Sequence, residues 1–363
     1  MAATAMNVLP APPPFLSLHT VRGERLRLGF VAPRETRIVA WLTQVEPEVA
    51  LQRIGLAFSL CRVAQRSAAQ LALHAAGATL ALPDHARLSA TVHAEWLREH
   101  ACNLLLSWPR LLGQPEEPAL VRALLQGADD SRAWQGAWTG PLTHDVLGIG
   151  PARFLALDRD GLAAWCAACA TPTAARFARW RGATPSVGPA PTLPPLEQWQ
   201  DETAATLAQH MCNEADFCAR PHWRGQACET GAHVRQRSHA LLQSWHALSG
   251  DDAAARMLAR LIELARTAAS DACAPALRAW CVAPGEGLAA VETARGPLLH
   301  WVRVAAGKVS DYRIVAPTEW NFRAHGVLER ALVQCAGDTT AQARAWVLAL
   351  DPCAECSVET GHA

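Results

Sequence analysis

Two pairs of cysteines have the spacing Cys-x-x-Cys, which can direct two thiolates at one soft metal ion. Cys353 and Cys356 follow an Asp-Pro step late in the sequence, and Cys166 and Cys169 lie in an apolar helical run. Each pair supplies half of a tetrahedral metal site, so neither is specific alone. The apolar context favours burial of Cys166 and Cys169 on one helix face. For Cys353 and Cys356, metal ligation and simple packing fit the spacing equally well.

Cys61 lies in a segment whose apolar residues recur with the spacing of one helix face, a pattern typical of a core residue. Gln65 is the one polar residue on that face. The spacings of six and ten residues between Cys212, Cys218 and Cys228 match no metal-binding pattern. Four further cysteines stand alone and are expected to be buried: Cys102, Cys273, Cys281 and Cys335.

The composition indicates a folded chain with balanced charge. Lys plus Arg is 33, Asp plus Glu is 33, and 50% of the 363 residues are hydrophobic. This balance argues against bulk binding to nucleic acid or an anionic membrane, and no apolar run reaches the roughly 18 residues of a membrane span. The first residues lack a basic region and an uninterrupted apolar region, so no secretory signal is predicted. We therefore expect a cytoplasmic protein whose 12 cysteines are reduced thiols.

The apolar periodicity predicts a mainly α chain with small antiparallel β-sheets, an α+β class. A flexible Pro-rich arm is expected over residues 1–20, and a hairpin over 24–31 and 36–43. Residues 181–196 are rich in proline and are expected to form a linker or surface loop. Helices are expected at 48–76, 86–107, 117–127, 158–170, 197–213, 235–247, 251–270, 324–335 and 338–350, and strands at 287–293, 297–304 and 309–316.

Five short blocks, in order along the chain, resemble the large subunit of nickel-iron hydrogenases. Cys61 matches the second cysteine of that family's RxCGxC motif, and Asp351-Pro-Cys353-Ala-Glu-Cys356 matches its DPCxxC motif. Three blocks between them also match: Glu229-Thr-Gly231 with Arg235, Glu292-Thr-Ala-Arg295-Gly296 followed by His300-Trp301, and Val315-Ala-Pro317-Thr-Glu-Trp320-Asn321. Any one block is weak evidence, whereas five in order make the resemblance specific.

The chain also departs from the large-subunit pattern at the positions that hold metal. Phe58 replaces the first cysteine of the N-terminal motif, Gln65 replaces its histidine, and Glu359 replaces the terminal histidine of DPCxxCxxH. The chain is shorter than catalytic large subunits. This combination resembles the HupK/HoxV-type hydrogenase maturation proteins, which are degenerate relatives of the large subunit.

The resemblance implies a site for iron that carries two cyanides and one carbon monoxide. Cys61 and Cys356 correspond to the pair that bridges nickel and iron, and Cys353 to a terminal nickel ligand. Nickel is not expected, because the phenyl ring of Phe58 cannot donate to it. Arg295 and Asp351 match residues near the diatomic ligands, where arginine could donate to a cyanide nitrogen. Two alternatives stay open: an ordinary Arg–Asp pair that holds the tail, and a zinc site on the three cysteines.

The implied fold is a large-subunit-like helical bundle, with residues 21–363 as one interlocked domain. The implied function is that of an assembly scaffold or carrier without hydrogenase activity, which takes the iron group from maturation proteins and delivers it to the hydrogenase large subunit. The alternative is a metal-free mimic that docks maturation factors or protects assembly from oxygen. Because the sequence ends four residues after Glu359, no proteolytic closure of the site is expected, and an unlocked tail would help to release cargo.

Overall fold

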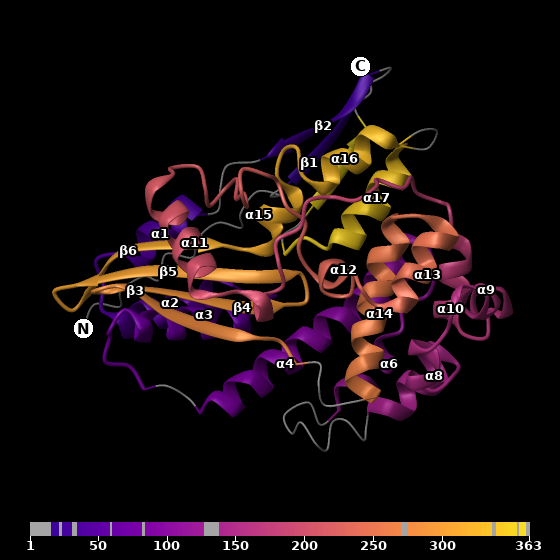
Figure 1. Ribbon diagram of the computed structural model, residues 1–363, viewed down its shortest axis with the longest axis horizontal. Coiled ribbons are helices and arrows are strands. Elements are labelled where there is room, and N and C mark those ends of the chain that lie inside the picture. The colour runs from indigo at the N-terminus through magenta and orange to yellow at the C-terminus, as the bar shows by residue number, and fades with distance from the viewer. Residues whose placement is uncertain are drawn as a thin grey trace, which may run out of the picture.

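A computed structural model describes residues 16–21, 24–30, 35–58, 60–81, 84–126, 138–269, 274–335, 339–353 and 356–360. Its framework is mainly helical with a small antiparallel sheet, which confirms the predicted fold class (Figure 1). Within these residues, no helix combines the length and the apolar character that crossing a bilayer would need. Every cysteine whose side chain is described is a free thiol.

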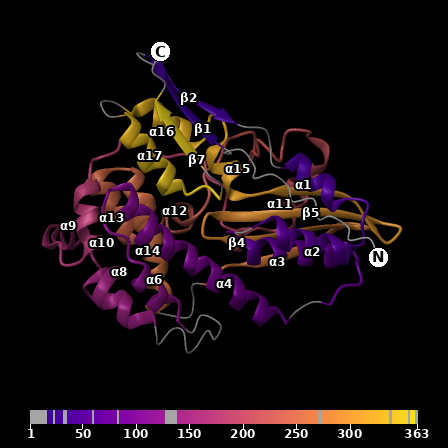
Figure 2. The ribbon, with the colours of Figure 1, turned by 180° about the vertical axis from the view of Figure 1, so that it is seen from behind.

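The four-stranded sheet is an antiparallel meander in the order β3-β4-β5-β6, made of Leu277–Ala283, Glu286–Thr293, Gly296–Ala305 and Lys308–Val315. Helices α2 (Pro47–Ala57) and α3 (Arg62–Ala75) cover one face, and α11 (Asp201–Asn213) lies on the other (Figures 1 and 2). The central strands β4 and β5 are therefore buried along most of their length. The predicted strands agree with β4 to β6, whereas β3 was not predicted.

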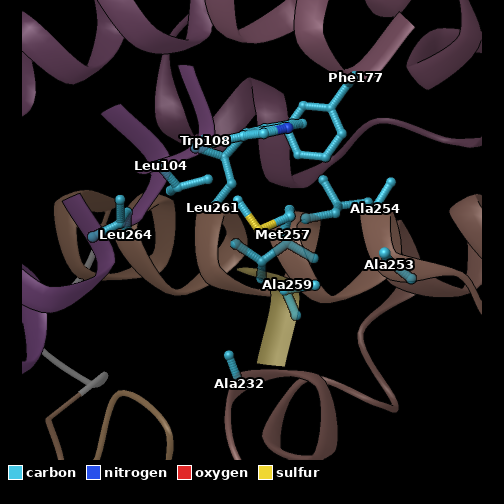
Figure 3. Packing of buried hydrophobic residues seen from close by; sticks show 14 of the residues in the cluster. Leu104, Trp108, Phe177, Ala232, Ala253, Ala254, Met257, Ala259, Leu261 and Leu264 are labelled. Atoms are coloured by element: carbon cyan, nitrogen blue, oxygen red, sulfur yellow. The ribbon is translucent and has the colours of Figure 1, made fainter. Parts of the chain in front are cut away.

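The helical body surrounds α14 (Ala253–Ala269), which is buried on nearly every side. Met257 and Leu261 of this helix pack toward Trp108 and Phe177, whose ring centroids lie 4.9 Å apart (Figure 3). The charged side chains of this helix, Arg256, Arg260 and Glu263, are buried as well, and each is paired with an opposite charge. The neighbours of α14 include α4 (His85–Cys102), α8 (Pro151–Leu155), α12 (Ala232–Arg235), α13 (Ala240–Ser249) and α17 (Thr339–Leu350).

The remaining helices complete the two layers and the body. They are α1 (Glu35–Leu42), α5 (Trp108–Leu111), α6 (Pro118–Leu125), α9 (Arg159–Ala168), α10 (Pro172–Trp180), α15 (Pro317–Phe322) and α16 (Val327–Gln334). Two π-helical turns, η1 (Asn103–Ser107) and η2 (Leu142–Leu147), and one 3₁₀ turn, η3 (Leu196–Gln198), interrupt the regular helices.

A second sheet joins the two ends of the chain. Strand β1 (Leu16–Val21) pairs antiparallel with β2 (Glu24–Phe30) and parallel with β7 (Cys356–Thr360). Residues 16–20 are therefore strand and not part of an arm, while residues 1–15 lie outside the described residues. The backbone of the tail at 356–360 is therefore paired with a strand from the other end of the chain.

One strand prediction and one helix prediction were wrong. Residues 36–43 form most of α1 instead of a strand, because Ile38, Val39 and Leu42 have helical spacing and all face the α2/α3 cluster. The single helix expected at 48–76 is broken into α2 and α3, with Phe58 extended and Cys61 at the N-cap of α3.

The proline-rich segment 181–196 is irregular as predicted, but it is not simply a surface loop. Leu193 and Leu196 are buried, and the backbone N–H of Leu193 donates to the carbonyl of Glu229 at 3.1 Å. The reciprocal bond runs from the Glu229 N–H to the carbonyl of Pro191 at 2.8 Å. These backbone bonds hold the segment against the Glu229 block, so it supports the site described next.

Candidate metal site at Cys61 and Cys353

Cys61 and Cys353 meet although they come from opposite ends of the chain, and their thiol groups share a hydrogen bond. Cys61 is buried at the N-cap of α3 with 8% exposure, and Cys353 follows the end of α17 and is partly buried. Thr318, from α15, holds Cys353 in place. Its hydroxyl oxygen accepts from the backbone N–H of Cys353 at 3.0 Å, and its hydroxyl group also bonds the sulfur.

The two thiols share one proton unequally. The hydrogen bond from Cys61 and the positive charge of Arg295 lower the pKa of Cys353 to about 7, against the opposing effect of burial. The same hydrogen bond, together with burial, raises the pKa of Cys61. Cys353 is thus the more acidic thiol of the pair, and Cys61 is the hydrogen-bond donor. Because a thiolate is the form that binds metal, a soft metal ion can replace the shared proton.

Arg295 lies beside the thiols and is held by two carboxylates. Its Nε donates to the main-chain oxygen of Asp351 at 2.7 Å and lies 3.0 Å from the Oδ2 of that residue. Its Nη2 lies 2.9 Å from Glu99 Oε2. Burial opposes the charge of Arg295, but Asp351, Cys353 and Glu99 hold its pKa above the usual value. The predicted contact between Arg295 and Asp351 is therefore present, and it places a permanent cation next to the thiolate.

The backbone of Asp351 directs the tail toward this cation. Asp351 has a φ of 54°, in the left-handed region that non-glycine residues seldom adopt. The chain turns sharply there, so the carbonyl of Asp351 reaches Arg295 and Cys353 reaches Cys61. The Asp-Pro step that follows α17 thus serves to return the chain to the site.

Three of the sequence blocks converge on the main chain of Arg295. The Thr230 hydroxyl donates to the Arg295 carbonyl at 3.1 Å, and Asn321 Oδ1 accepts from the Thr230 N–H at 2.9 Å. Gly231 has a φ of 98°, and a Cβ on it would lie 2.8 Å from the Arg295 carbonyl oxygen. The close approach requires glycine. The blocks around Glu229, Glu292 and Asn321 therefore act together to fix the position of Arg295.

Gln65 connects Cys61 to a buried chain of polar side chains. Its Nε2 lies 3.8 Å from Cys61 Sγ, and its Oε1 accepts from His300 Nε2 at 2.8 Å. His300 Nδ1 in turn lies 2.7 Å from the hydroxyl of Tyr312, which fits a neutral ring that accepts there. Burial lowers the pKa of His300 to about 3, so the ring stays uncharged. This chain orients Gln65 toward the Cys61 sulfur.

The sequence analysis missed several residues that shape the site. Glu95 accepts from the backbone N–H groups of Val63 and Ala64 at 2.9 and 2.8 Å and so caps α3 immediately after Cys61. Glu99 pairs with Arg295, and Thr318 holds Cys353. Glu95 and Glu99 recur four residues apart on α4, a spacing that indicates one helix face but not the partner of that face.

Behind Arg295, a buried ionic network extends into the helical body. Arg260 lies 3.3 Å from Asp351 Oδ2 and 3.2 Å from His100 Nδ1, and His100 Nε2 lies 2.8 Å from Glu263. Glu263 also receives two bonds from Arg235, at 2.7 and 2.8 Å. Arg235 belongs to one of the family blocks, so that block has a structural role at the centre of this network.

Other predicted residues have mixed outcomes. The side chains of Cys356 and Glu359 lie outside the described residues, so the pairing of Cys61 with Cys356 stays a prediction. Phe58 is partly buried against the α2/α3 cluster.

Among the other cysteines, Cys166 is in the core as expected. Cys169 and Cys281, expected to be buried, are exposed, because Cys169 lies past the end of α9 and Cys281 lies on the outer strand β3. Cys102 and Cys335 are only partly buried, and Cys273 lies outside the described residues.

Comparison with known proteins agrees with this arrangement. A family model described as nickel-dependent hydrogenase matches residues 174–359. The hydrogenase expression/formation protein HoxV of Cupriavidus necator is 31% identical, over 86% of this chain and 87% of its own. The hydrogenase expression/formation protein HupK of Azotobacter vinelandii is 30% identical, over 93% and 97%.

Solved structures of hydrogenases share the fold. The Ni-Fe-Se hydrogenase of D. vulgaris Hildenborough superposes with a TM-score of 0.52 at 16% identity, covering 91% of this chain and 93% of that one. The enzyme from Desulfomicrobium baculatum gives a TM-score of 0.55 at 14% identity, over 93% and 95%. The meeting of Cys61 with Cys353, the convergence of the blocks on Arg295 and these likenesses lead to one conclusion. The chain belongs to the nickel-dependent hydrogenase family, together with the HoxV and HupK hydrogenase expression/formation proteins.

Proposed function

We propose that this protein acts in hydrogenase maturation as a carrier of the iron group with its cyanide and carbon monoxide ligands, and that it delivers this group to the hydrogenase large subunit. The names of its relatives support a maturation role. The observation that carries the proposal is the shared hydrogen bond of Cys61 and Cys353 beside Arg295. A buried thiol–thiolate pair next to a cation is a site prepared for a soft metal.

The cargo would be held by thiolates and oriented by Arg295. Cys61 and Cys356 are the proposed iron ligands, with Cys353 as a further thiolate, and the assignment of Cys356 depends on its motif. Low-spin iron with cyanide and carbon monoxide suits thiolate sulfur. Because Asp351 and Glu99 fix the guanidinium of Arg295, its remaining N–H groups can donate to a cyanide nitrogen.

On binding, the metal replaces the proton that the two thiols share. Release of the cargo would reverse this exchange. In the metal-free site Cys61 keeps its proton because burial and the hydrogen bond to Cys353 raise its pKa. Reprotonation of Cys61 therefore favours departure of the iron group. We do not propose that nickel binds at this site, since Phe58 offers no donor atom. We therefore expect no hydrogenase activity.

A metal-free role as a large-subunit mimic that docks maturation factors or protects assembly from oxygen is the second candidate. One observation favours it: the charged groups of the site already pair with one another. Arg295 is paired with Glu99 and Asp351, and Cys353 with Cys61 and Thr318. A site that is complete without cargo can be a purely structural copy of the enzyme's centre.

Infrared spectroscopy separates the two candidates. The protein is purified without air from cells that contain the maturation machinery, in wild-type form and as Cys61→Ser, Cys353→Ser and Cys356→Ser. The carrier proposal expects carbon monoxide and cyanide stretches that disappear in Cys61→Ser and Cys356→Ser. Cys281→Ser is the matched control, because this thiol is exposed on the outer strand β3. Absence of the bands in wild type, with maturation partners still bound, would establish the metal-free role instead.

A further inference from the structure

Three potential metal ligands lie together at the end of α11. They take no part in the cysteine site described above. His210 is in the last turn of the helix, Glu214 is its C-cap, and the following loop returns to bring His222 alongside. His210 Nδ1 lies 2.5 Å from Glu214 Oε1, and His222 Nε2 lies 2.9 Å from Glu214 Oε2. Each residue can supply one ligand atom within 4.8 Å of the others.

The two imidazole rings are held in place by a buried aromatic ring. Phe217 is 1% exposed, His210 stacks on it at a centroid distance of 5.3 Å, and His222 meets its edge, also at 5.3 Å. Arg323 anchors the loop by donating to the carbonyl of Arg220 at 3.1 Å and to that of Pro221. Side chains that are already held in place lose little conformational entropy when a metal binds. These contacts therefore favour a preformed site.

The charge and exposure of this cluster suit a divalent cation. The carboxylate of Glu214 offers one oxygen to each of the two imidazoles. Within the described residues, the ion pairs of Glu214 are with these two histidines and with no arginine. The side chains of His210, Glu214 and His222 are 27%, 43% and 23% exposed, so water can complete the coordination.

A second group, His233, His246 and Asp251, has similar spacing but a different electrostatic setting. Its carboxylate already accepts from Arg256, which also pairs with Glu229 at 2.8 Å. An arginine in this position occupies the carboxylate and repels a metal ion. We therefore assign no metal to this second group, and it provides a matched control.

We propose that His210, Glu214 and His222 form a site for a divalent transition metal of the zinc class. Metal–ligand bonds of about 2.0–2.2 Å place the ligand atoms of a tetrahedral site about 3.4 Å apart, so small movements from the present hydrogen-bonded positions suffice. Two imidazoles and one carboxylate leave the fourth position to water. The cysteines of this segment, Cys212, Cys218 and Cys228, pack into the hydrophobic cluster on this side of the sheet. The site therefore offers nitrogen and oxygen only, and it differs chemically from the cysteine site.

Zinc binding to the full-length protein tests the proposal. Titration calorimetry and metal analysis are done on wild type, His222→Gln and Glu214→Gln, with His246→Gln as the control. We expect both cluster variants to lose one equivalent of zinc, or to bind it at least about 100-fold more weakly, while His246→Gln binds as wild type. X-ray absorption at the zinc edge is expected to show nitrogen and oxygen ligands for the equivalent that is lost.

Two outcomes would overturn the site. One is unchanged zinc stoichiometry and affinity in both cluster variants, and the other is a wild-type protein whose zinc has sulfur ligands only. Circular dichroism establishes that each variant is folded. Glu214→Gln keeps an oxygen that can accept from a histidine, so it serves where His222→Gln disturbs the loop.

Discussion

Replacement of Arg295 by glutamine is the sharpest test of the cysteine site. The guanidinium lies 2.9 Å from Glu99 and 3.0 Å from Asp351, with all three side chains largely buried. Arg295→Gln would remove the cation that Glu99 and Asp351 share, and would leave Asp351 with Arg260 at 3.3 Å and Glu99 with the half-exposed Arg98 at 2.9 Å. Breaking a buried pair in this way lowers the free energy of unfolding by about 3–5 kcal/mol. Urea unfolding of the metal-free protein measures this loss.

The same variant changes the chemistry of Cys353. Its pKa of about 7 depends on the hydrogen bond from Cys61 and on the charge of Arg295. Removing the charge raises the pKa of Cys353, so less thiolate is present at neutral pH. The alkylation rate of Cys353, followed against pH by mass spectrometry of its peptide, reports the thiolate directly. We expect the midpoint of this profile to move to higher pH in Arg295→Gln.

Arg110→Gln is the matched control for this experiment. Arg110 makes the same kind of two-bond contact with Glu116, at 2.8 and 2.9 Å, but the pair is exposed to solvent. Its loss is expected to leave both the free energy of unfolding and the Cys353 profile nearly unchanged. If Arg295→Gln were no less stable than Arg110→Gln, or if the Cys353 profile did not move, the assignment of Arg295 as the cation that supports the thiolate would be wrong.

Two further predictions concern the framework around the site. In Gly287→Ala the new Cβ would lie 2.1 Å from the Ala72 carbonyl oxygen, so α3 must move away from β4. We expect the free energy of unfolding, measured in urea, to fall by about 3 kcal/mol or more. Gly140→Ala is the control, because its new Cβ meets nothing within 4 Å and should cost no stability. The second prediction concerns pH: His300 has a pKa of about 3 when folded and about 6.5 when unfolded, so the unfolded state binds the extra proton below pH 6.5. Between pH 7 and 5 the wild type should therefore lose about 2 kcal/mol more than His300→Gln, and equal losses would contradict a neutral buried ring.

Local patterns were enough to predict several elements of the fold. Strands β4 to β6 agree with the prediction because β-branched residues lie two positions apart in β4 and β5, and a turn around Ala306–Gly307 separates β5 from β6. The helix prediction at 338–350 agrees with α17 because the Asp-Pro step ends it. The fold class followed from the same signals.

The break between α2 and α3 could not be predicted from the local sequence. Residues 48–76 carry strong helix formers throughout, so propensity predicts one helix. The carboxylate of Glu95, more than thirty residues later in the sequence, satisfies the free N–H groups of Val63 and Ala64 and allows a new helix to begin at Arg62. The N-cap position given to Cys61 by this break is what turns its thiol toward Cys353.

The residue types at the site were evident in the chain alone. Cys61, Cys353, Arg295 and Asp351 could be named from short motifs, because each motif requires a particular side chain at a particular spacing. Which cysteine is ionised followed only from the folded protein. The pKa of a thiol depends on charges and hydrogen-bond donors within a few ångströms, and here they come from helices and turns that are far apart in the sequence. Folding brings those groups together and makes Cys353 the more acidic of the two thiols.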